Sequence, residues 1–156
     1  MATTKTLTAG SYATGNQAGE PVINDHKWDV EVKVNGDLIQ VGELPAFHRL
    51  APEGCRFYAL NRAGVLAAAT YDVFIPTAEG VAKAAANTLF DNVAVVANTA
   101  QSVAPAAADF LVAEGLGVAN VNRPIYIDAQ AAPATAAGTI KVRIASFPDD
   151  KITLTI

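Results

Sequence analysis

The sequence predicts an all-β fold: an antiparallel, jelly-roll-like β-sandwich with at most one or two short helices. Seven or eight short apolar segments lie between turns rich in Pro and Gly, a spacing typical of sandwiches rather than of α/β proteins. Several of these segments alternate polar and apolar residues, as a strand with one buried face does. No repeat of fixed period is present, which disfavours solenoids and propellers.

The first two strands are expected between Trp28 and Pro45. From Trp28 to Val34 every second residue is apolar, and the residues between them are charged. Asn35-Gly36 follows, the dipeptide that best suits a type I′ turn. A second apolar run, Leu38 to Val41, then returns toward Pro45. This stretch therefore predicts a β-hairpin with one buried face.

Residues 1–20 are expected to form an extended N-terminal arm, and residues 21–156 a single β-sandwich domain. The arm is rich in Thr, Ala, Gly and Ser and offers only Leu7 and Tyr12 to a core. We expect residues Ala2 to Gly19 to become ordered on binding another subunit, where an extended segment can add a strand to a sheet. A merely frayed terminus is the alternative.

In the first half of the domain, two segments are predicted as strands. Cys55 to Asn61 has mixed faces, whereas Thr70 to Ile75 is rich in β-branched and aromatic residues and is followed by a proline. Pro52-Glu53-Gly54 predicts a turn after the segment Pro45 to Leu50. The secondary structure of Gly64 to Ala69 is ambiguous from the sequence.

Two segments have a helix-forming composition. Val81 to Asn87 is short for a stable helix. Val103 to Gly115 fits a helix with Pro105 in its first turn and Gly115 at its end, and an Ala-rich loop is the alternative.

The second half of the chain predicts four more strands. The strands are expected at Asn92 to Asn98, Ile125 to Asp128, Thr139 to Phe147 and Lys151 to Ile156. Ala131 to Gly138 is predicted to be a low-complexity turn before the strand that begins at Thr139.

Large side chains for a core are few, because aromatics make up only 7% of the chain and much of its 51% apolar content is alanine. A thin core under an Ala-rich surface indicates burial against other chains. We therefore expect self-association as a dimer or trimer, with a monomer bearing Ala-rich loops as the alternative. The expected core residues are Trp28, Phe57, Tyr58, Tyr71, Phe74, Phe90, Phe110, Tyr126 and Phe147.

Charge and cysteine content disfavour several classes of partner. The formal net charge is −4 and the basic residues are scattered, so we expect neither nucleic-acid nor membrane binding. Cys55 is the single cysteine, which rules out an intrachain disulfide. The polar N-terminus does not resemble a signal peptide, and no apolar run approaches the length of a transmembrane helix. We expect the protein in a reducing cytoplasm or in a particle assembled there.

No group of residues in the sequence predicts a catalytic, metal or cofactor site. His26, His48, Cys55 and Asp25 lack the spacing of metal ligands, and Asp25-His26 is expected at a surface strand start. Cys55 is expected to be a small buried hydrophobe rather than a nucleophile. We therefore expect no catalytic residues, no metal site, no cofactor and no enzymatic activity.

Two other motifs are superficial matches. Gly115 to Asn120 (GLGVAN) lacks the third glycine and the strand-to-helix context of a dinucleotide loop. Asp128 and Asp149-Asp150 lack the alternating acids of a calcium loop.

Three segments carry a family resemblance. They are Gly36 to Leu50 (GDLIQVGELPAFHRL), Thr70 to Pro76 (TYDVFIP) and Ala132 to Ala145 (APATAAGTIKVRIA). In this order they resemble the head-decoration, or capsid cement, proteins of tailed bacteriophages. The chain departs from that pattern at Phe74-Ile75, where Leu-Gly is common.

The resemblance implies a multimeric, non-catalytic β-sandwich on the outer surface of a phage capsid. Such proteins bind the major capsid protein between capsomers and stabilise the shell, so the virion exterior is the implied location and the host cytoplasm the place of assembly. The alternative is a fibre or tail-associated module that binds a host glycan or receptor. Phe47-His48-Arg49 or Phe57-Tyr58 would then supply exposed aromatic contacts.

Overall fold

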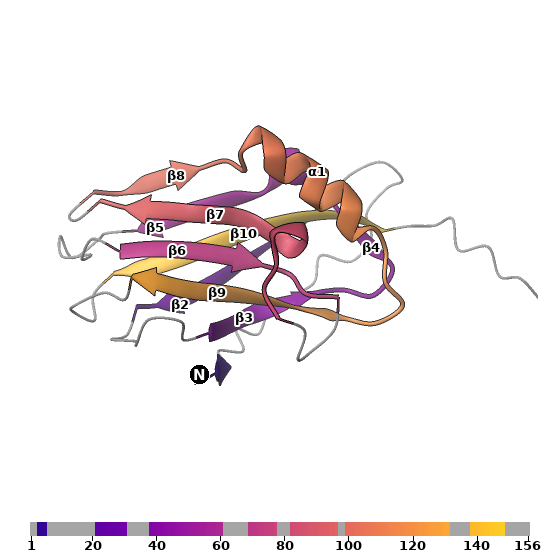
Figure 1. Cartoon of the computed structure of the whole chain (residues 1–156), viewed down its shortest axis with the longest axis horizontal. Coiled ribbons are helices and arrows are strands. Elements are labelled where there is room, and N and C mark those ends of the chain that lie inside the picture. The colour runs from indigo at the N-terminus through magenta and orange to yellow at the C-terminus, as the bar shows by residue number, and fades with distance from the viewer. Residues whose placement is uncertain are drawn as a thin grey trace, which may run out of the picture.

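The computed structural model describes residues 3–5, 21–30, 38–60, 69–77, 82–96, 99–131 and 138–148. They form two β-sheets that pack face to face, with one α-helix beside them (Figure 1). The strands are β1 (Thr3–Lys5), β2 (Val22–Asp29), β3 (Leu38–Leu44), β4 (His48–Leu50), β5 (Arg56–Leu60), β6 (Ala69–Phe74), β7 (Thr88–Val95), β8 (Gln101–Val103), β9 (Arg123–Ala131) and β10 (Thr139–Pro148). The helices are the 3₁₀ turns η1 (Pro52–Gly54) and η2 (Ala85–Asn87) and the α-helix α1 (Ala107–Leu116).

The strand order is that of a jelly roll. One sheet has the order β2-β10-β5-β8, and the other has β3-β9-β6-β7 with β1 added beside β3. Apart from the short β4, which pairs with β10, successive strands from β2 onward change sheet at every step except β6 to β7. Eight strands arranged in this way form two interlocked Greek keys. The predicted all-β sandwich of jelly-roll type is confirmed.

The predicted hairpin at Asn35-Gly36 is wrong for the described parts of its strands. β2 pairs with β10, whereas β3 pairs with β9, so the two strands belong to opposite sheets. The alternation itself is real, but it begins earlier, at Val22, and buries every second residue as far as Val30. Alternation specifies which face of a strand is buried, and it does not specify the neighbour with which the strand pairs.

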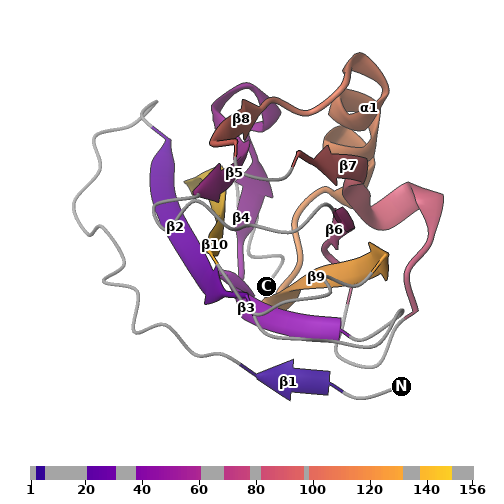
Figure 2. The same cartoon turned by 90° about the vertical axis from the view of Figure 1, so that its left-hand side faces the viewer.

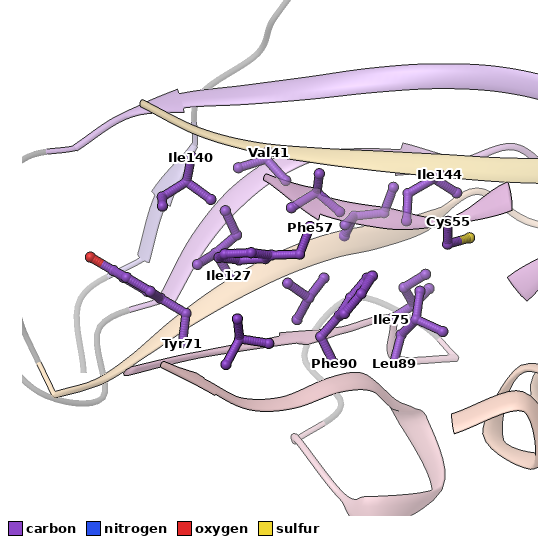
Figure 3. Close-up of a cluster of buried hydrophobic side chains, with 14 of the residues drawn as sticks. Val41, Cys55, Phe57, Tyr71, Ile75, Leu89, Phe90, Ile127, Ile140 and Ile144 are labelled. Carbon is purple, nitrogen blue, oxygen red and sulfur yellow. The ribbon is translucent and has the colours of Figure 1, made fainter. Parts of the chain in front are cut away.

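The core lies between the two sheets, around Phe57 (Figure 3). The Phe57 ring lies 6.3 Å from the ring of Tyr71 and 6.1 Å from that of Phe90. Trp28 meets Tyr71 edge to face at 6.0 Å. Tyr71 and Phe90 come from one sheet and Phe57 and Trp28 from the other, so aromatic contacts join the two sheets.

The other predicted core aromatics lie elsewhere. Phe74 and Tyr126 are buried with their rings 5.2 Å apart, but they belong to no part of the main cluster between the sheets. Tyr58 and Phe147 are half-buried. Phe110 is 38% exposed, so its prediction as a core residue is wrong.

The helix and one strand differ from their predicted bounds. α1 begins after Pro105 rather than around it, and it runs through Gly115 to end at Gly117, whose φ is +51°. Positive φ favours glycine and terminates helices. The strand predicted at Asn92 to Asn98 begins earlier, at Thr88, and β8 was not predicted. The strand predicted at Lys151 to Ile156 lies outside the described residues.

Strand β1 belongs to the segment predicted as an arm. Thr3 to Lys5 pair in parallel with Leu38 to Gln40 of the chain's own β3 (Figure 2). We expected this segment to become ordered on binding another subunit. For these three residues, the structure instead shows pairing within the chain. The rest of the arm lies outside the described residues. The edge of β3 is therefore able to accept an added strand.

Candidate functional site

The residues tested as metal ligands do not come together. Asp25 is on the outer face of β2 and is bound by Arg143 at 2.8 Å and 3.1 Å; this hydrogen bond keeps the pKa of Asp25 below its usual value. His48 Nδ1 lies 3.0 Å from Ser146 Oγ. Among the residues that the structure describes, no three His, Cys, Asp or Glu side chains gather as a metal-binding group.

Cys55 is buried, as predicted. Its thiol lies 3.4 Å from the carbonyl oxygen of Ala51, and burial raises the pKa of Cys55 to about 11. A thiol with this pKa is protonated at neutral pH and is a poor nucleophile.

His26 is buried in mid-strand, so its expected surface position is wrong. It is 7% exposed and points between the sheets toward Gly42 of β3. A Cβ atom at Gly42 would lie 2.1 Å from His26 Nδ1. Burial lowers the pKa of His26, with a backbone hydrogen bond to Val41 acting in the opposite direction. Neutral His26 therefore fills the space that a side chain at Gly42 would need.

This burial predicts a loss of stability in mild acid. The unfolded chain protonates His26 near pH 6.5, whereas the folded chain resists protonation until the pH is lower, so the unfolded state binds more protons as pH falls. We expect the free energy of unfolding to fall by up to about 1.4 kcal/mol between about pH 7.5 and 5.5. Burial lowers the pKa of His48 in the same direction.

Urea unfolding at several pH values would measure this slope. The variant His26→Gln should have a shallower slope than the parent, whatever its absolute stability. An unchanged slope would show that His26 is not the group responsible.

A groove of about 600 Å³ lies between η2, β7 and α1. Three carboxylates line it, those of Asp72, Asp91 and Asp109, and Lys83 is its single cation. Burial raises the pKa of Asp109, and the nearby charge of Asp91 adds to this effect. A smaller hollow of about 250 Å³ shares Asp91 and Asp109 with it. We call Asp91, Asp109 and Glu114, on β7 and α1, the acidic side of the molecule.

Lys83, which lines this groove, forms salt bridges with one acid on β6 and one on β9. Its Nζ atom lies 2.7 Å from Asp72 Oδ2 and 2.6 Å from Asp128 Oδ2. Asp72 and Asp128 are directly opposite each other on β6 and β9, where two like charges would repel. Burial acts to lower the pKa of Lys83, but its hydrogen bonds to the two carboxylates outweigh burial and raise it. The lysine therefore stays charged, and by binding both carboxylates it reduces the repulsion between them.

The sequence did not predict this contact of Lys83 with Asp72 and Asp128. The only signal was an acid inside each of two apolar strands, Asp72 in TYDVFI and Asp128 in IYIDA. Neither segment reveals that the two acids face each other, because strand register cannot be read from sequence alone.

Exposed apolar side chains gather at the end of the molecule near the C-terminus of α1. Phe47 is 39% exposed and has a φ of +61°, a conformation that is strained for an aromatic residue. Hydrogen bonds hold this loop in place: Phe47 N–H donates to Ala119 O at 2.7 Å, and Ala46 N–H donates to Asn122 Oδ1 at 2.9 Å. Val118 and Val121 in the facing loop are also exposed.

Arg123 fixes these two loops to the helix. Its guanidinium is buried and donates to three backbone carbonyls: Leu116 O at 2.7 Å, His48 O at 2.9 Å and Gly117 O at 3.0 Å. Leu116 and Gly117 are at the C-terminus of α1, where the helix dipole favours a cation.

The outer face of the other sheet is cationic. Two neighbouring cross-strand rows cross β2, β10 and β5, and they hold four basic residues, one acid and Tyr58. Lys141 Nζ lies 4.3 Å from the centre of the Tyr58 ring. We call this surface the basic face. Its rows are Lys27, Lys141 and Tyr58, and Asp25, Arg143 and Arg56.

Solved structures include one with a similar fold. A chain in the capsid of Ralstonia phage GP4 matches with a TM-score of 0.56 at 20% sequence identity, over 87% of this chain and 89% of that one. The likeness is one of fold, and it extends over nearly the whole of both chains. No protein-family model matches the chain, and no curated protein matches it. Among the described residues, no helix is long and apolar enough to cross a membrane.

Proposed function

We propose that this chain is a phage decoration protein, which binds the outer surface of a capsid between capsomers and stabilises the shell. The observation that carries the proposal is the fold shared with a chain from the capsid of Ralstonia phage GP4. The three segments that resemble head-decoration proteins, Gly36 to Leu50, Thr70 to Pro76 and Ala132 to Ala145, support it independently.

The surface of the molecule suits a role in assembly rather than in catalysis. Its hollows are lined by carboxylates and small residues, and its buried thiol is protonated. A decoration protein can act through many modest contacts, because repetition over a lattice raises the total strength of binding. We propose that the chain has no enzymatic activity, that its partner is the major capsid protein, and that it joins the capsid exterior in the host cytoplasm.

The N-terminal segment is the proposed tether. β1 already pairs with the β3 edge through its backbone, and backbone pairing of this kind needs no special side chains. In an assembled shell the same three residues could pair instead with the sheet edge of a neighbouring subunit.

Electron microscopy of virions, with and without the gene, tests this proposal. We expect density for a β-sandwich outside the shell, its loss in the deletion particles, and breakage of those particles at a lower temperature. Purified full-length protein should restore the density. Protein lacking residues 2–19 should restore much less. Density in the tail, or unchanged particles after deletion, would contradict the proposal.

The exposed Phe47 favours a second candidate function, a fibre or tail-associated module that binds a host glycan or receptor. Of the aromatics predicted for that role, Phe57 is buried and Tyr58 is covered by Lys141, whereas Phe47 is exposed in a strained conformation. Binding to host cells that is lost in Phe47→Ser would support this second function.

A further inference from the structure

Charge is segregated between the two sides of this molecule. Between Lys83 and Arg123 the sequence contains no Lys, Arg or His, and its acids there are those of the acidic side. This segment forms η2, β7, β8 and α1. In Figure 2, α1 and β7 lie on one side of the sandwich, and β2 and β10, which carry most of the basic face, lie on the other.

The basic face keeps like charges next to each other. Lys27 is directly opposite Lys141, and Arg56 is directly opposite Arg143. Like charges in opposed positions on a sheet are destabilising. Asp25 pairs with Arg143 and approaches Lys141 at 3.5 Å. An anionic partner placed beside Arg56 would relieve the repulsion between Arg56 and Arg143.

We propose that the chain associates head to tail with a second copy of itself, so that the acidic side of one copy docks on the basic face of the next. The partner on the basic face is a second copy, because the acidic side of the chain carries the complementary charge. The sequence led us to expect self-association, and these are the two surfaces through which we propose that it occurs.

The charge pattern also determines the symmetry of the contact. A twofold contact places the same surface of both copies together, which here would join acid to acid or base to base. A contact between two different surfaces avoids that repulsion. Such heterologous contacts close into rings, including trimers, when the rotation allows it.

Arg56 and Asp91 are the proposed central pair. Both are exposed, and Arg56 makes no ion pair with any described residue. The groove beside Asp91 has room for a guanidinium, with the carboxylate of Asp109 on its wall; Asp72, which also lines it, already pairs with Lys83. Arginine forms two-pronged hydrogen bonds with carboxylates. The exposed side chains of Leu111, on α1, and Val96, directly after β7, would add apolar contact.

Sedimentation velocity of the purified full-length protein tests the contact. We expect species heavier than the 16.1 kDa monomer at about 50 mM salt and their dissociation at about 500 mM, because salt screens charge pairs between exposed surfaces. Asp91→Arg and Arg56→Asp should each weaken association at least about tenfold. The double variant, which exchanges the two charges, should restore it.

Glu53→Arg is the matched control, because it changes the net charge as Asp91→Arg does but lies on η1, outside both surfaces. Association should be unchanged or slightly altered in this variant. A monomer at low salt, equal weakening by the control, or failure of the double variant to recover would overturn the proposal. None of these results would remove the proposed capsid binding, which is measured on virions, so the two proposals can fail separately.

Discussion

Gly42→Ala should destabilise the fold by about 3 kcal/mol, toward the upper end of the range for overpacked cores. The new Cβ atom would lie 2.1 Å from Nδ1 and 2.3 Å from Cε1 of His26. The ring cannot move aside easily, because it is buried between the sheets at a register shift in β3. For a domain of this size, the loss corresponds to a fall in melting temperature of about 6–12 °C.

Two variants test the cause of this effect. Gly115→Ala is the matched control, since a Cβ atom there meets nothing within 4 Å, and alanine in a helix should be neutral or stabilising by up to about 1 kcal/mol. The double variant Gly42→Ala/His26→Ala removes the ring as well and should recover stability relative to Gly42→Ala. A double variant less stable than Gly42→Ala would show that the clash with His26 is not the cause.

The sequence predicted the fold class well because alternation reports burial directly. The alternation around Trp28 and the strand from Thr70 to Ile75 both appear in the structure, and so does the run from Thr139 to Phe147. What failed was the pairing inferred from Asn35-Gly36. That dipeptide specifies local turn geometry, whereas in a jelly roll the partner of each strand comes from distant sequence.

The candidate surfaces could be predicted less well than the fold. Individual charges such as Asp91 and Arg56 are visible in the sequence, but their placement on opposite sides depends on the strand order. The scattered basic residues were interpreted as lacking any cluster. Cross-strand neighbours such as Arg56 and Arg143 are far apart in sequence and adjacent in space, so a linear reading misses the basic face.

Arg123→Met should destabilise the chain by about 3–5 kcal/mol, because three backbone carbonyls would lose their donor and each buried polar group left unsatisfied costs about 1–3 kcal/mol. Methionine has a similar length and leaves little cavity, but it donates no hydrogen bonds. The carbonyls of Leu116, Gly117 and His48 would then lose their partner. Burial lowers the pKa of Arg123, yet a guanidinium remains cationic at neutral pH. It therefore both caps α1 and joins it to the loop that presents Phe47.

This arrangement predicts where the damage should appear. Amide hydrogen exchange in Arg123→Met should accelerate first at the C-terminal turn of α1 and at Phe47, whose N–H donates to Ala119 O. The strands of the basic face should keep their protection, because Arg123 donates to none of them. Arg123→Lys should fall between the parent and Arg123→Met, since an ammonium keeps the charge but cannot match the forked geometry. Uniform acceleration over the whole chain would contradict a local role and would make Arg123 part of the global core. Selective acceleration would instead identify the Phe47 loop and the end of α1 as one unit, whose geometry is set by a single buried cation.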